Sequence, residues 1–142
     1  MHRRSLLVAL IVLLTTVGTW SQGPADPYHS APPSKGAKLP PILSKGQLWF
    51  AQQPYQRRVY EAAAANASVL YQLPCRCHCG RMGHTSLRTC FETTHGAGCD
   101  VCMKEALYAA LQTSKGKTPA QIRDGIERSE FSRIDLETGR MQ

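Results

Sequence analysis

The chain has 142 residues, which is room for one small domain, and its formal net charge is +7. Its Lys and Arg residues are scattered and form no stripe interleaved with aromatic residues, which argues against a nucleic-acid-binding protein. All six cysteines lie within one short stretch, from Cys75 to Cys102.

The first residues are typical of a secretory signal peptide. Met1-His-Arg-Arg4 is a short basic start, and an apolar run of about ten residues follows it. That run is shorter than the roughly 20 residues of a membrane-spanning helix. We expect a leader over residues 1–21, whose removal takes Arg3 and Arg4 and leaves a charge of +5.

The predicted location of the mature protein follows from this leader. No cysteine stands between the apolar run and Cys75, so we expect no lipid attachment there. We predict a secreted or periplasmic protein with no stable membrane insertion after signal cleavage. The alternative is a protein tethered to the membrane by an uncleaved N-terminal segment.

Residues 22–45 hold six of the nine prolines. Such a segment cannot form regular backbone hydrogen bonds and has few side chains to bury. We expect a disordered linker here, followed by one domain over residues 46–135 and a flexible tail over residues 136–142.

The local signals within the domain are helical. Residues 57–66 are rich in helix-forming side chains, with a break expected at Asn66 and a short apolar piece over 69–73. From residue 100 to 114 the apolar residues recur with the spacing of one helical face. Thr118-Pro119-Ala120-Gln121 predicts another helix start, with a capping hydroxyl and proline in the first turn. The expected fold is mainly α, a small helical domain with loops around the cysteines.

The cysteines are accompanied by histidines at close spacing. Nine soft or borderline metal ligands fall in 28 residues: Cys75, Cys77, His78, Cys79, His84, Cys90, His95, Cys99 and Cys102. In an extended chain Cys75, Cys77 and Cys79 would share one face while Arg76 and His78 point to the other. A bend would be needed for these thiols to converge on one ion, and we expect Cys-x-Cys neighbours to be poor disulfide partners.

Cys99-Asp-Val-Cys102 opens the helix predicted from residue 100. Residues three apart in a first helical turn lie on one side, so both sulfurs are expected to face one ion or each other. The helix N-terminus also favours thiolate over thiol. This spacing therefore suits a metal site and a redox pair alike.

Three interpretations of the cluster stay open: a metal site, a redox thiol site and a disulfide frame. Six cysteines in an exported small domain fit a frame of three disulfides. Three histidines placed among the cysteines are not needed for such a frame and favour a metal site. The pattern does not match haem attachment, a zinc finger or a Ser/His/Asp grouping.

At these residues the chain resembles an exported bacterial family named for a Pro-Cys-Tyr-Cys-Gly-Cys motif, the CYCXC family of (seleno)proteins. The motif stands here as Pro74-Cys-Arg-Cys-His-Cys79, followed by Gly83-His84, Cys90-Phe91, His95-Gly96-Ala97, Cys99-Asp-Val-Cys102 and Glu105-Ala106. Arg76 and His78 depart from the Tyr and Gly of the name. The family has no characterised function, and selenocysteine in some members implies redox or soft-metal chemistry.

The sequence-based hypothesis is an exported metal-binding protein that holds copper or zinc. Its predicted ligands are Cys75, Cys77, Cys79, His84, Cys90, His95, Cys99 and Cys102. The first alternative is a thiol–disulfide redox protein that uses Cys99 and Cys102, and the second is a disulfide-stabilised interaction domain without metal. The expected partners are the metal ion and an exported redox or metal-delivery protein.

Overall fold

The computed structural model describes residues 25–142, so the predicted leader over 1–21 lies outside the described residues. The described part is mainly helical, as predicted, and its β-structure is a single isolated bridge between Ile134 and Met141. The α-helices are α1 (Pro54–Ala65), α2 (Ala67–Tyr71), α3 (Asp100–Ser114) and α4 (Pro119–Glu127). The short 3-10 helices are η1 (Lys45–Gln47), η2 (Cys79–Met82), η3 (Leu87–Phe91), η4 (Thr94–Gly98) and η5 (Glu130–Arg133). Within residues 25–142, no helix has the length and apolar character needed to cross a membrane.

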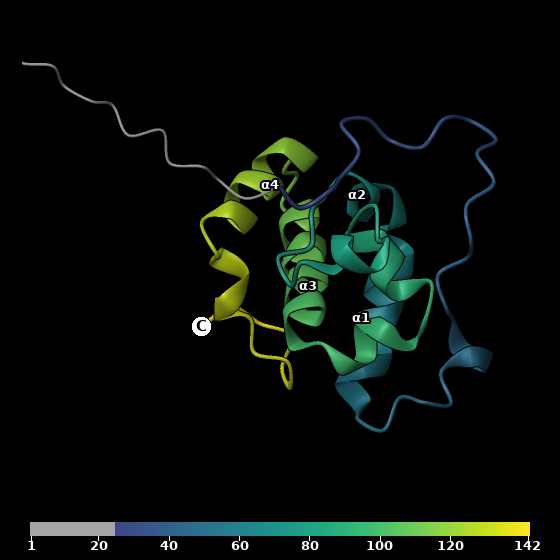
Figure 1. Cartoon of the computed structure of the whole chain (residues 1–142). Helices are drawn as coiled ribbons and strands as arrows, with labels where there is room; N and C mark the ends of the chain where they lie inside the picture. The colour runs from purple at the N-terminus through teal and green to yellow at the C-terminus, as the bar shows by residue number, and fades with distance from the viewer. Residues whose placement is uncertain (1–24) are drawn as a thin grey trace, which may run out of the picture.

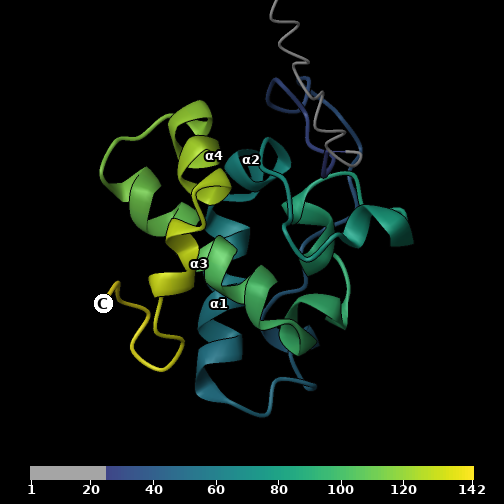
Figure 2. The ribbon, with the colours of Figure 1, turned by 60° about the vertical axis from the view of Figure 1, so that its left-hand side comes forward.

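Helix α3 is the central element, and it contacts α1, α2, α4 and η5 as well as η3 and η4 (Figures 1 and 2). The predicted apolar face is confirmed, since Met103 and Leu107 are buried and Ala110 and Leu111 are partly buried. The N-terminal half of α3 therefore lies in the core, and its residues Cys102 and Glu105 are buried there.

Helix α4 begins as the sequence predicts. The Thr118 hydroxyl accepts a hydrogen bond from the Gln121 N–H, and Thr118 N–H donates to the Gln121 side chain. This reciprocal cap satisfies two backbone donors that the helix leaves free. Ile122 and Ile126 are both fully buried, as their spacing indicates.

The predicted helix over 57–66 is α1, which starts earlier because Pro54 occupies its first turn. Asn66 interrupts it as expected, and the apolar piece predicted over 69–73 forms α2 two residues earlier. The buried Tyr60 of α1 donates a hydrogen bond of 2.7 Å to the Thr93 carbonyl. Helix α1 thus anchors the segment that carries His95.

Residues 25–44 are irregular, as their prolines predict, and both ends of the segment contact the domain while its middle arches away from the helices (Figure 1). His29 stacks on Tyr71 with ring centroids 3.7 Å apart, and Leu43 N–H donates to the Phe91 carbonyl. Asp26 is 8% exposed. The segment expected to be a free linker is therefore attached to the domain at both ends, and we call it the strap (residues 25–44).

The last residues also pack on the domain, where a flexible tail was expected over 136–142. The Arg58 guanidinium donates to the carbonyls of Leu136 and Glu137. The backbone folds back on itself, with Asp135 N–H bonded to the Arg140 carbonyl. These contacts tie the end of the chain to α1.

Candidate metal centre

The first three cysteines lie on a sharply bent loop between α2 and η2. The bend is made at His78, whose backbone is left-handed with φ of 60°, and His78 N–H bonds back to the Cys75 carbonyl. Because of this turn, the thiols point inward while the side chains of Arg76 and His78 point toward the strap, a division that the sequence predicted for an extended chain but that the turn produces here. Asp26 of the strap contacts both of these side chains. Its Oδ1 lies 2.8 Å from His78 Nδ1, and its Oδ2 accepts a hydrogen bond of 3.3 Å from the Arg76 guanidinium.

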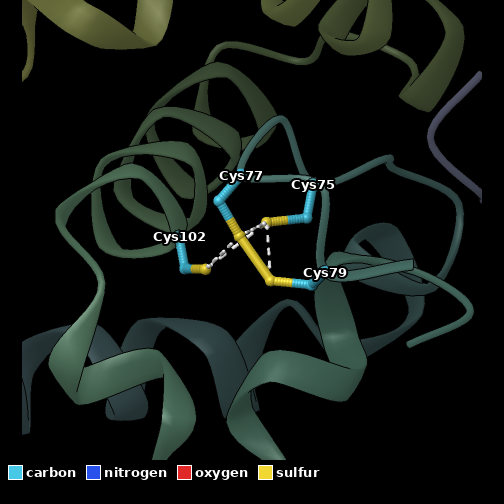
Figure 3. A group of neighbouring side chains, drawn as sticks. All are labelled: Cys75, Cys77, Cys79 and Cys102. Carbon is cyan, nitrogen blue, oxygen red and sulfur yellow. Dashed lines mark hydrogen bonds between the residues drawn. A yellow bond between two sulfur atoms is a disulfide. The ribbon is translucent and has the colours of Figure 1, made fainter. Parts of the chain in front are cut away.

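The bent loop brings three sulfurs to the buried side chain of Cys102 on α3 (Figure 3). The ligand atoms of Cys75, Cys77, Cys79 and Cys102 all lie within 4.8 Å of one another. Cys75 Sγ is 3.3 Å from Cys77 Sγ, 4.0 Å from Cys79 Sγ and 3.4 Å from Cys102 Sγ. Four thiolates around a tetrahedral ion with bonds of about 2.3 Å are about 3.8 Å apart, which is close to the distances from Cys75 Sγ to the other three sulfurs.

Cys77 and Cys79 form a disulfide in this structure, with Cα atoms 5.6 Å apart. The expectation that Cys-x-Cys neighbours make poor partners was therefore wrong for this pair. It rested on an extended chain, and the left-handed His78 between them folds the backbone so that their side chains converge. The loop is thus compatible with a disulfide, and its reduction would supply two thiolates at the same place.

A second group of ligand atoms overlaps the first. Cys79, Cys90, His95 and Cys102 also lie within 4.8 Å of one another, and His95 Nε2 is 3.1 Å from Cys79 Sγ. Cys90 comes from η3 and His95 from η4. The two groups share Cys79 and Cys102, so six of the eight predicted ligands form one continuous cluster.

The other two predicted ligands, His84 and Cys99, belong to neither group among the described residues. His84 Nδ1 lies 3.3 Å from Cys90 Sγ, and its ring is perpendicular to that of His95. Cys99 is a half-buried free thiol at the N-cap of α3, where its backbone is extended. It therefore lacks the helical geometry that would align it with Cys102. As ligands, His84 and Cys99 stay predictions.

The buried thiols share negative charge before any ion binds. The hydrogen bond with Cys102 Sγ at 3.4 Å and the nearby Cys90 thiol lower the pKa of Cys75, so the negative charge of these buried thiols is located mainly on Cys75. The same interaction with Cys75 raises the pKa of Cys102, which keeps its proton. Burial lowers the pKa of His84 and keeps its imidazole neutral. The cluster thus contains a thiolate beside thiols whose protons a metal ion can displace.

Glu105 and Asp26 hold the cysteine loop, and neither was among the predicted site residues. Glu105 is fully buried, and its Oε1 accepts a hydrogen bond of 2.9 Å from the Arg76 N–H. Burial and the nearby Cys75 charge raise the pKa of Glu105 to about 10, so this carboxyl is neutral at pH 7. Its position three residues after Cys102, on the apolar face of a helix, is the sequence signal that could have identified it.

The chain matches the family model described as a protein of unknown function with PCYCGC motif, over residues 37–132. The chain belongs to this family. The matched region contains all the predicted ligands and confirms the resemblance to the family named for the PCYCGC motif. No curated protein and no solved structure matches the chain.

The structure explains the glycine in the family's motif. That glycine corresponds to His78, the residue with the left-handed backbone, which glycine adopts without steric cost. In this chain the histidine takes the same conformation, and its ring is held by Asp26. The turn that makes the thiols converge is therefore formed here with histidine at the glycine position of the motif.

Proposed function

We propose that this chain is an exported metal-binding protein that holds a soft ion, zinc or copper(I), in the cysteine cluster. The observation that carries the proposal is the convergence of Cys75, Cys77, Cys79 and Cys102, whose sulfurs lie within 4.8 Å of one another. Three of these side chains are buried and Cys77 is half-buried. Thiolates are the preferred ligands of zinc and copper(I), whereas magnesium and calcium require oxygen.

Binding in this cluster would couple metal affinity to the redox state of the protein. The Cys77–Cys79 disulfide must first accept two electrons and two protons to become two thiols. The ion then displaces the remaining protons, and its binding ties the cysteine loop to α3. The oxidised protein is expected to bind the same ion much more weakly.

Export is supported by the basic start at Arg3 and Arg4 and the short apolar run after it. N-terminal sequencing of protein from the extracytoplasmic fraction should find a mature chain starting between about Thr19 and Pro24. Recovery of the intact Met1 terminus from the membrane fraction would instead favour the tether.

The metal proposal is tested on reduced protein purified without oxygen. Elemental analysis combined with alkylation should find bound zinc or copper and thiols that are protected until a chelator is added. The Cys77→Ser variant should lose most of the metal, while Ser44→Ala, a change on the strap remote in sequence from the cluster, should keep it. A reduced, folded protein that takes up neither metal would refute the proposal.

A second candidate function is thiol–disulfide exchange, favoured by the Cys77–Cys79 disulfide itself. A partner dithiol would attack one sulfur, the Cys77–Cys79 bond would break, and the partner would leave as a disulfide while this pair becomes two thiols. The redox pair would then be Cys77 and Cys79, whereas the sequence suggested Cys99 and Cys102. Equilibration with glutathione and mass mapping of the alkylated cysteines would show which pair exchanges.

A further inference from the structure

The two ligand groups overlap, and this overlap indicates how many ions the cluster holds. The inference rests on the proposed function and extends it. Cys75 and Cys77 belong to the first group alone, while Cys90 and His95 belong to the second alone. Cys79 and Cys102 belong to both. Two tetrahedra that share two corners have this composition, with each shared thiolate contacting both ions.

We propose that the reduced protein holds two zinc-type divalent ions, bridged by the thiolates of Cys79 and Cys102. The first ion is completed by Cys75 and Cys77, and the second by Cys90 and His95. Each ion then has four ligands, as structural zinc sites require. The two bridging residues are both fully buried, and they come from opposite sides of the cluster, the cysteine loop and α3.

The charge of the cluster favours two divalent ions over one. Five cysteines contribute thiolates to the two groups, which amounts to five negative charges in a largely buried site. Charge that is buried without compensation is strongly unfavourable. One divalent ion in the first group leaves two of its four thiolate charges while Cys90 stays a neutral thiol, two divalent ions leave one of five, and two copper(I) ions leave three. The donor set therefore favours zinc-type ions over copper(I).

The surroundings of the second ligand pair also suit an ion. His95 points its Nε2 at Cys79, so the imidazole already faces a bridging sulfur at 3.1 Å. His84 lies 3.3 Å from Cys90 Sγ and can donate a hydrogen bond to that thiolate, as groups around metal ligands commonly do. His84 thereby has a role in the centre without being a ligand.

The number of ions per chain separates this inference from the proposed function. Full-length mature protein is reduced with a phosphine, loaded with zinc alone, and weighed by native mass spectrometry. We expect two zinc ions per chain, and one in the Cys90→Ser and His95→Ala variants. One ion in the unchanged protein would overturn the bridged centre and leave the proposed function standing. No bound zinc would also overturn the bridged centre, and it would refute the proposed function as well if the reduced protein does not bind copper(I) either.

Bridging is tested on the unchanged sequence, so the result does not depend on whether a variant folds. The protein is loaded with ¹¹³Cd in place of zinc, and its cadmium NMR spectrum is recorded. Two resonances that split each other are expected, because the shared sulfurs transmit coupling between the ions. Two resonances without mutual splitting would show separate ions and overturn the bridged arrangement.

Discussion

The two cysteine motifs of this protein use their thiols differently. The Cys75–Cys79 loop delivers all three of its cysteines to the cluster, whereas the Cys99–Cys102 helix start delivers only Cys102. The loop bends at the left-handed His78, which turns its thiols toward one point. At the helix start, Cys99 precedes the first helical residue and its backbone is extended. Whether a cysteine joins the cluster thus depends more on the backbone conformation at that residue than on the spacing of the cysteines in the sequence.

Glu105 and Asp26 connect these two regions from opposite sides. Glu105 lies one turn after Cys102 on α3 and holds the loop through the Arg76 backbone N–H. Asp26 of the strap holds the same loop through the outward side chains of Arg76 and His78. The loop is therefore positioned by elements distant from it in the sequence.

The largest effect is expected from comparing the two cysteines of the helix start. Cys102→Ser removes a ligand that both groups share, so zinc affinity should fall by more than about 100-fold. Cys99→Ser should change it by about twofold or less, since Cys99 belongs to neither group. Competition with a chromophoric chelator measures the zinc affinity of each variant. Equal losses in the two variants would mean that the helix start contributes both sulfurs.

The contact between helix and loop is expected to depend on pH in the metal-free protein. Folding raises the pKa of Glu105 from its usual 4.5 to about 10, so between these values the folded state holds a proton that the unfolded state releases. The contribution of Glu105 to the free energy of unfolding therefore falls as pH rises through this window, by on the order of 1 kcal/mol per pH unit.

Glu105→Gln should remove this dependence, because its amide stays neutral. Urea unfolding at several pH values should show that the free energy of unfolding of the variant rises relative to that of the unchanged protein as pH rises from 5 to 8. Glu61→Gln, on the exposed face of α1, is the control and should follow the unchanged protein. Parallel pH profiles for Glu105→Gln and the unchanged protein would show that Glu105 is ionised in the fold.

The bend of the loop can be tested at His78. Alanine adopts a left-handed backbone at a cost of about 1 kcal/mol, which glycine does not incur. Both His78→Gly and His78→Ala remove the contact with Asp26, so the difference between their stabilities reports the cost of the left-handed backbone alone. We expect His78→Gly to unfold at higher urea concentration than His78→Ala. Identical midpoints would show that the left-handed turn is not needed for stability.

The smallest effect is expected at the strap. Asp26→Asn removes the charge that faces Arg76 and His78 but keeps the shape of the side chain. These partners are 36% and 61% exposed, so solvent screens the interaction and the expected loss is about 0.5–1 kcal/mol. Asp124→Asn, at an exposed position of α4, is the control for thermal unfolding. A loss no greater than that of the control would mean that the strap does not stabilise the loop.

The sequence alone determined the helices and the location of the cluster. The apolar spacing over 100–114 and the cap at Thr118 depend on neighbouring residues, so α3 and α4 could be predicted from local rules. The density of Cys and His identified the site, and six of its eight predicted ligands fall in the two groups.

Only the tertiary structure decided which thiols meet. Cys75 and Cys102 are 27 residues apart in sequence, and their contact depends on how α3 packs against the loop. Glu105 and Asp26 reach that loop from residues 29 and 50 positions away from Arg76. The strap was expected to be free because its prolines prevent regular structure, but irregular backbone can still pack when side chains such as His29 find a partner. Local patterns specify the conformation of a segment, whereas its contacts depend on the surfaces that the rest of the chain presents.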